Sequence, residues 1–84
     1  MPKIVYSAES ATPPDEAQLK RQRLEAADFW DADDLQFITG ISAPTWRYWA
    51  QNGDGPTSFK IGRRRVWRRT VAEEWLREQE RAGA

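Results

Sequence analysis

The densest group of chemically active side chains is a run of cations in the second half of the chain. Six basic residues and no acid occupy positions 60 to 69: Lys60, Arg63, Arg64, Arg65, Arg68 and Arg69. The planar guanidinium group matches phosphate oxygens and guanine edges, and it suits narrow minor grooves. These cations repel one another, and a polyanion would relieve that repulsion. We therefore expect this stretch to bind nucleic acid.

The residues that carry these cations predict a β-hairpin. Positions 58–61 alternate polar and apolar side chains, positions 62–64 suit a turn, and positions 65–68 return with β-branched and aromatic residues. Two short strands with arginines at the tip form a wing. The predicted DNA contacts of this wing are Lys60, Arg63, Arg64 and Arg65. For Arg68 and Arg69 a second role stays open, namely capping the next helix or pairing with Glu73 and Glu74.

A short helix should precede this hairpin and present a second binding surface. Ser42 is a suitable N-cap, Pro44 fits the first turn, and Gly53 can end a helix that spans about 43–52. Helical spacing places Trp46, Trp49 and Ala50 on one face, which we expect to pack inward. The predicted DNA-reading residues of this recognition helix are Ser42, Pro44, Thr45, Arg47, Tyr48 and Gln51.

Two more helices are expected on either side of this unit. Asp31 can cap a helix over about 32–39, and Thr70 with Glu73 forms a capping-box pattern for a helix through Gln79. The acids at 31, 33 and 34 are interpreted as a solvated helix start. A magnesium site is the alternative, but carboxylates in one first turn diverge and no other oxygen ligands adjoin them.

The chain divides into three parts on this interpretation. Residues 1–28 form an N-terminal extension, a flexible tail followed by a helix over 13–27 with Thr12 as N-cap and Asp15 at the third helical position. That helix lacks a clean apolar stripe, so it should pack loosely or against a partner. Residues 29–80 form the DNA-binding domain, and residues 81–84 fray.

Composition argues against several classes of function. The 84 residues include no cysteine and no histidine, so the usual zinc ligands and general bases are missing. We expect no catalytic residues, no metal site, no cofactor and no enzymatic activity. No run of 18 apolar residues occurs and the first residues lack a signal-peptide pattern. The expected location is the cytoplasm, without membrane association.

The formal net charge of zero hides a separation of charge along the chain. Residues 1–39 carry four basic and eight acidic side chains, residues 40–70 carry seven and one, and residues 71–84 carry two and four. A local charge of +6 favours binding to DNA. An acidic block and a basic block on one small body also predict head-to-tail self-association on DNA. Phe37 and the helix over 13–27 would supply apolar contacts.

The order of these motifs resembles the MerR-like winged-helix proteins of the AlpA and phage excisionase (Xis) type. The matching pieces are Gly40-Ile41-Ser42 with Thr45 and Trp49, then Gly55-Pro56, then Lys60-Ile61-Gly62-Arg63-Arg64, then Glu73 to Leu76. The match covers about fifty residues. The chain departs from the pattern at Trp46, usually aliphatic, at Phe37, usually polar, and in its N-terminal thirty residues.

This resemblance implies an α+β fold, mostly α: a winged helix-turn-helix with a two-stranded β-hairpin wing. It implies that the helix with Thr45, Arg47 and Tyr48 enters the major groove and that the Arg63-Arg64 tip enters a minor groove. It also implies an excisionase, an architectural protein that bends attachment-site DNA and directs a tyrosine integrase toward excision. A small phage or plasmid transcription regulator is the alternative, and a protein-interaction adaptor is a third reading. Stacking of single-stranded bases on the five tryptophans is less favoured, because the helical spacing of Trp46, Trp49 and Trp75 suits a core. We also expect Trp30 and Trp67 in the core.

Overall fold

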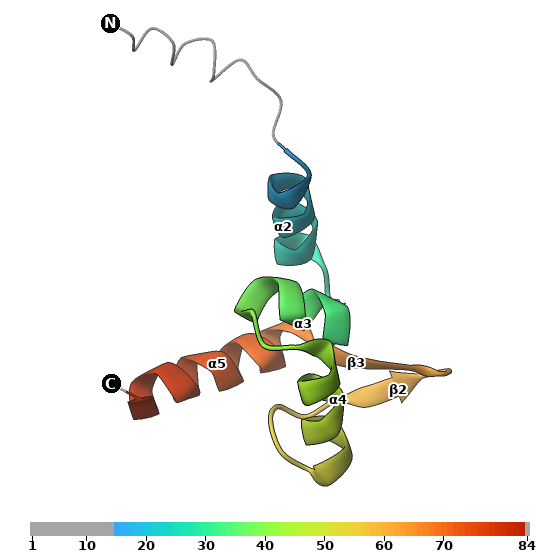
Figure 1. Ribbon diagram of the computed structural model, residues 1–84, viewed down its shortest axis with the longest axis vertical. Helices are drawn as coiled ribbons and strands as arrows, with labels where there is room; N and C mark the ends of the chain where they lie inside the picture. The colour runs from blue at the N-terminus through green and yellow to red at the C-terminus, as the bar shows by residue number, and fades with distance from the viewer. Residues whose placement is uncertain (1–14, 84) are drawn as a thin grey trace, which may run out of the picture.

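The computed structural model describes residues 15–83, which form an α+β fold that is mostly helical (Figure 1). The elements in chain order are α2 (Glu16–Ala26), β1 (Phe29–Asp31), α3 (Ala32–Thr39), α4 (Ala43–Asn52), β2 (Phe59–Ile61), β3 (Arg64–Arg68) and α5 (Arg69–Gly83). The predicted α+β class is confirmed at this level. Within residues 15–83, no helix combines the length and the apolar character needed to span a membrane.

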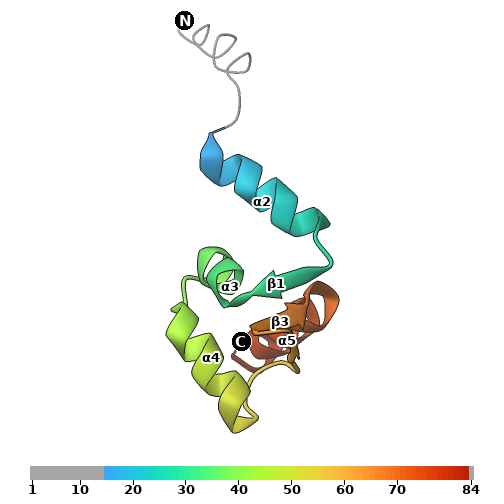
Figure 2. The same cartoon turned by 90° about the vertical axis from the view of Figure 1, so that its right-hand side faces the viewer.

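Helices α3 and α4 have the bounds that their capping residues predict. Asp31 Oδ1 accepts the backbone N–H of Asp34 at 2.8 Å, and Asp34 Oδ2 accepts that of Asp31 at 3.0 Å, which completes a capping box. Gly40 ends α3 with a φ of 79°, a conformation that favours glycine. Ser42 then caps α4, so a turn of three residues sets the two helices at an angle (Figure 2).

The sheet contains one strand that the sequence did not predict. Its order is β1-β3-β2, and both pairings are antiparallel. β1 brings Trp30 opposite Trp67 and Phe29 opposite Arg68. The hairpin therefore has a third strand that ties it to the start of α3.

The hairpin turn is one residue shorter than predicted. Ile61 pairs with Arg64, which leaves Gly62 and Arg63 as the two turn residues. Gly62 has a φ of 62°, as the first central position of a type II′ turn requires. Arg64 is therefore the first residue of β3 and not part of the tip, and it lies on the opposite face of the sheet from Arg65.

Tryptophan side chains dominate the core between the sheet, α3, α4 and α5. Trp46 is fully buried, and its ring meets those of Trp49, Trp67 and Trp75 with centroids at 5.1, 6.2 and 5.8 Å in edge-to-face geometry. Edge-to-face aromatic pairs contribute about 0.5–1.5 kcal/mol each beyond area burial. Trp49 and Trp75 are only partly buried, so Trp46 is the centre of the inward face of α4.

Helix α2 begins later than predicted and belongs to the core at its C-terminal end. Asp15 is its N-cap and accepts the backbone N–H of Gln18 at 2.8 Å, so it is not the third helical residue. Thr12 and Pro13, expected to start the helix, lie outside the described residues. Leu24 is buried, and its carbonyl oxygen accepts the Nε1–H of Trp30 at 2.9 Å. Packing therefore continues across the predicted boundary at residue 28.

Phe37 also differs from its expected role as an apolar contact for self-association. Lys20 Nζ lies 5.0 Å from the centre of its ring, and the guanidinium carbon of Arg21 lies 5.6 Å away. Cations over a ring face are attracted by its quadrupole. α2 thus covers Phe37 within the same molecule, which leaves it half-buried.

Helix α5 follows β3 directly and is longer than predicted at both ends. Its first residue is Arg69, so Thr70 is inside the helix and is not its N-cap. The Arg69 backbone N–H donates to the carbonyl of Asp28 at 2.8 Å, and its Nε donates to the carbonyl of Ala27 at 2.6 Å. The helix runs to Gly83, so residues 81–83, predicted to fray, are helical.

Candidate nucleic-acid interface

The outer face of α4 carries the predicted recognition residues, but only some of their side chains are exposed and without a hydrogen bond to a neighbour in the described structure. Arg47, Tyr48 and Gln51 are exposed, and Tyr48 exposes 62% of its surface. Ser42 caps the helix, since its Oγ accepts the backbone N–H of Thr45 and contacts the Thr45 hydroxyl at 2.8 Å. Ser42 and Thr45 are thus already hydrogen-bonded to one another, while Arg47, Tyr48 and Gln51 are available to a ligand.

The hairpin divides its cations between the two faces of the sheet. Lys60 pairs with Arg65 across β2 and β3, so both side chains lie on one face. Arg65 Nη1 donates to Ser58 Oγ at 2.8 Å, which holds its guanidinium on that face. Arg64 and Arg68 lie on the other face.

The helix and the hairpin meet at one open hollow. It has a volume of about 340 Å³ and is lined by Arg47, Gln51, Lys60, Arg63 and Arg65. All five residues are predicted DNA contacts, two from α4 and three from the hairpin. The fold thus brings together side chains that are distant in sequence, with four cations and one amide facing a shared space. Ser42, Pro44, Thr45 and Tyr48 do not line this hollow.

A neighbouring hollow mixes cations with acids. Its volume is about 280 Å³, and Arg47, Arg63, Arg64 and Arg65 line it together with Asp31, Ala32 and Asp33. Arg64 forms an ion pair and hydrogen bond with Asp31, and Arg47 Nη2 lies 3.8 Å from Asp33 Oδ1. These two carboxylates offset part of the repulsion among the four arginines.

The pKa values of the two acids in the α3 capping box, Asp31 and Asp34, shift in opposite directions. Burial alone would raise the pKa of Asp31, but the backbone N–H of Asp34 and the guanidinium of Arg64 outweigh it, so the pKa lies below its usual value. Burial raises the pKa of Asp34, with a further contribution from the negative charge of Asp31. The structure thus favours an ionised Asp31 beside the arginines.

Sequence reasoning missed the part that Asp31 and Asp33 play at this surface. We interpreted both as solvated acids of a helix start, and the cap at Asp31 is indeed present. Their second contacts, to Arg64 and Arg47, depend on how β1 and α3 pack beside the hairpin and α4. A local sequence pattern carries no signal for such contacts.

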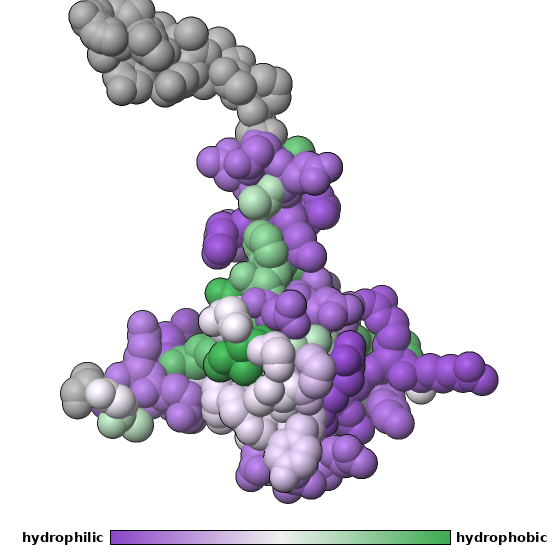
Figure 3. Space-filling view, in the orientation of Figure 1, coloured by the Kyte–Doolittle hydropathy of each residue, from purple (hydrophilic) through white to green (hydrophobic). Residues whose placement is uncertain are grey.

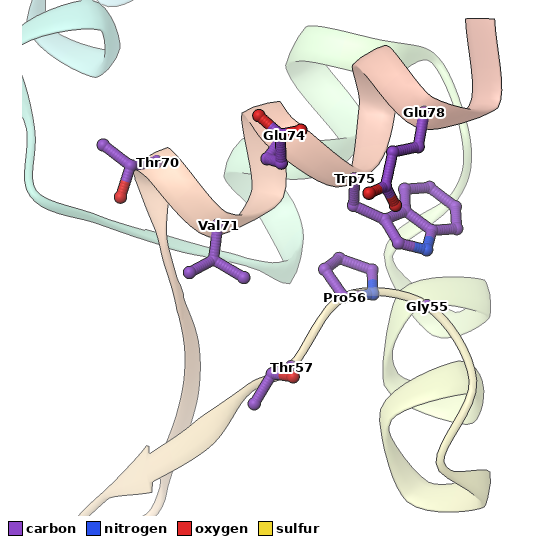
Figure 4. A pocket seen from close by; sticks show the side chains of 8 residues that line it. All are labelled: Gly55, Pro56, Thr57, Thr70, Val71, Glu74, Trp75 and Glu78. Carbon is purple, nitrogen blue, oxygen red and sulfur yellow. The ribbon is translucent and has the colours of Figure 1, made fainter. Parts of the chain in front are cut away.

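A third hollow lies away from the arginines and has a different character. It is about 330 Å³ in volume and lies between the loop at 55–57 and α5. Figure 4 shows Pro56 and Trp75 facing one another there, with Glu78 beside the indole. Glu74 and Glu78 make this rim acidic, so it offers nothing to a phosphate. The cations that line the two hollows described before it come from α4 and the hairpin.

Hydrophilic residues extend over the projecting hairpin and much of α2 (Figure 3). Apolar residues gather instead where α2 joins the body of the molecule. Comparison with known proteins gives no match to a protein-family model, to a curated protein or to a solved structure. Function is therefore argued from the geometry of this surface.

Proposed function

We propose that the chain is a winged helix-turn-helix protein that binds double-stranded DNA. In this proposal α3, the turn at 40–42 and α4 form the helix-turn-helix, and β2 with β3 forms the wing. The observation that carries the proposal is the hollow lined by Arg47 and Gln51 from the helix and by Lys60, Arg63 and Arg65 from the hairpin. Four cations on two adjoining elements suit two neighbouring segments of a phosphate backbone.

The arrangement assigns different tasks to the two elements. α4 has ten residues, about 15 Å of helix, and it fits the major groove with Arg47, Tyr48 and Gln51 outward. Arginine pairs with guanine and glutamine with adenine through two hydrogen bonds each. The hairpin tip at Arg63 would lie over the adjacent minor groove, where arginine responds to groove width. Lys60 and Arg65 would contact phosphates between the two.

The specific biological role follows from the resemblance described above. We propose an excisionase, which bends attachment-site DNA and favours excision by a tyrosine integrase. A small phage or plasmid transcription regulator would use the same interface. An excisionase would bind attachment-site DNA, whereas a regulator would bind promoter DNA. A protein-interaction adaptor would show little DNA affinity, so the first experiment tests DNA binding itself.

That experiment is a titration of fluorescent duplex DNA with the full-length protein at several salt concentrations. If Lys60, Arg63 and Arg65 of the hairpin each neutralise one phosphate charge, log K should fall with log salt at a slope of about −2.7. Arg47→Ala should reduce affinity for the specific site by roughly 1–3 kcal/mol and affinity for random DNA by less.

The matched control is Arg77→Ala, since Arg77 is an exposed arginine on α5 that pairs with Glu74. It should leave both affinities unchanged. Salt-independent binding, or an equal effect of both substitutions, would contradict the proposed interface. A footprint on attachment-site and promoter DNA would then distinguish the two roles.

A further inference from the structure

The three-stranded sheet exposes apolar side chains on the face opposite the core. Alternation along the strands places Trp30 and Trp67 inward and Phe29, Phe59 and Val66 outward. The rings of Phe29 and Phe59 lie 5.7 Å apart at 80°. Val66 is buried although it lies outside the main core cluster. The outer sheet face, as we call it, consists of Phe29, Phe59, Ile61 and Val66, with Arg64 and Arg68 at its margins.

Phosphate binding would not explain the exposed apolar residues of this face. Phe59 exposes 42% of its surface and Ile61 exposes 55%. Scattered apolar residues are ordinary on a protein surface, but these adjoin one another, since Phe59 pairs with Val66 and meets Phe29 edge to face. Burying them against a partner would be favourable by about 25 cal/mol per Å² of apolar surface.

The charges at the margins indicate what kind of partner fits. The guanidinium of Arg68 lies 4.7 Å from the centre of the Phe29 ring, and Arg64 keeps most of its side chain exposed. The one carboxylate on this face, Asp31, already pairs with Arg64. The complementary ligand is therefore apolar at its centre and acidic at its ends.

The shape of the face favours an extended chain. β2 is an edge strand of the sheet, and its apolar side chains Phe59 and Ile61 follow a period of two. An extended segment with apolar residues at every second position and acidic residues at its ends repeats at the same spacing and can align with an edge strand.

A second copy of this chain fits less well. Helix α2 contains two acids and three bases. On α5, Glu73 pairs with Arg69 and Glu74 pairs with Arg77. The apolar residues beside Glu78 line a hollow between a loop and α5, and this hollow is not an extended segment. We propose that the outer sheet face binds an extended, acidic and apolar segment of a different protein, while α4 and the opposite side of the hairpin remain free for DNA.

The test is a titration of the ¹⁵N-labelled full-length protein with a synthetic peptide that has Val or Phe at alternate central positions, Thr between them, and Asp or Glu at both ends. The expected result is a set of amide shift changes at residues 29–31 and 59–68. Ile61→Thr should weaken binding about tenfold, because it removes an apolar contact worth about 1.4 kcal/mol. Leu19→Thr, which changes an exposed apolar residue of α2, is the matched control and should bind as the parent does.

Each other outcome overturns the proposal. Shift changes confined to Arg47 and Gln51 would mean that the peptide merely imitates DNA. Self-association without peptide that Ile61→Thr abolishes would assign the face to a second copy. Displacement of the peptide by duplex DNA would assign the face to the DNA interface. No shift change at saturating peptide would exclude this ligand class. The peptide titration requires no DNA, so its failure would not contradict the proposed DNA binding, and a failure of DNA binding would not contradict it.

Discussion

Arg47 of α4 lies 3.8 Å from Asp33 of α3, measured from Nη2 to Oδ1, at the centre of the proposed DNA surface. Both side chains are largely exposed, at 57% and 73%. An exposed ion pair contributes about 0–1 kcal/mol to stability, so the pair has little importance for the fold. In a complex, however, Asp33 would lie close to phosphates and would oppose their binding.

Asp33→Asn should therefore change DNA binding more than stability. We expect affinity for random DNA to rise roughly threefold to tenfold at low salt, because a repelling charge is removed from a phosphate-binding surface. Discrimination between the specific site and random DNA should change little, since general attraction increases for both. Fluorescence anisotropy on the two DNAs measures this. Glu78→Gln, an exposed acid of α5, is the control, and an equal gain in that variant would refute a local effect.

The two arginines that flank Arg64, Arg63 and Arg65, test the role of the hairpin in DNA binding more sharply than Arg64 does. Arg63 and Arg65 line the hollow with α4, while Arg64 pairs with Asp31. Replacing Arg63 and Arg65 together with alanine should make the slope of log K against log salt shallower by about 2. Arg64→Ala should change that slope by about 1 or less. If Arg64→Ala has the larger effect, the assignment of faces is wrong.

Local chemistry explains which parts of the fold could be predicted from the sequence. The bounds of α3 and α4 follow from Asp31, Gly40, Ser42 and Gly53, each of which acts on backbone groups within a few residues. β1 was missed because three residues carry too little periodic signal, and its partner Trp67 is far along the chain.

The sequence predicted which residues form the candidate site, but it did not predict how they are arranged in space. The arginine run and the exposed side of α4 identified all five residues of the shared hollow. We predicted Arg64 as the last residue of the turn, but it is the first residue of β3, because the sequence does not distinguish a two-residue turn from a three-residue turn. The contact between Asp33 and Arg47 depends on the packing of α3 against α4, which local patterns do not encode.

Substitutions at Trp46 test the core. Trp46→Ala should lower the free energy of unfolding by about 3–5 kcal/mol, because it removes a fully buried ring that meets three others. Trp46→Phe should cost less, since the Nε1 of Trp46 is buried without a hydrogen-bond partner in the described structure. Urea denaturation measures both. Equal losses for the two variants would show that ring volume does not determine stability here.

Asp34 gives a prediction about pH. A carboxyl group whose pKa is raised by folding stabilises the fold below its unfolded pKa, near 3.8, and loses that contribution as pH rises through the folded pKa. Ionised Asp34 therefore costs stability at neutral pH. Asp34→Asn keeps an oxygen for the backbone N–H of Asp31 without the charge, so it should stabilise the protein at pH 7. The advantage should vanish below pH 3.8. A variant less stable at pH 7 would contradict this.

Two N-terminal deletions test whether α2 is part of the domain. Deleting residues 1–14 leaves the described contacts of α2 in place, so that variant is the reference for the longer deletion. Deleting residues 1–28 removes Leu24 from the core and takes its carbonyl from the Trp30 indole. The loss of Leu24 burial alone should cost about 1.5–3 kcal/mol. Tryptophan fluorescence reports both melting curves, and equal curves would contradict the docking of α2.

The same pair of deletions makes head-to-tail assembly on DNA testable. Asp31 and Asp33 already pair with arginines of their own molecule, so the acidic block has fewer free carboxylates than its sequence indicates. Assembly stays a prediction: a monomer in solution that fills adjacent DNA sites cooperatively. Gel shifts on DNA with one, two and three sites measure this for the parent and for the shorter deletion, in which the core is intact. Independent filling of the sites by the parent protein would exclude an array. If the shorter deletion retains cooperativity, the contact must come from residues 15–83, because residues 1–14 are then absent and the DNA-binding surface is unchanged.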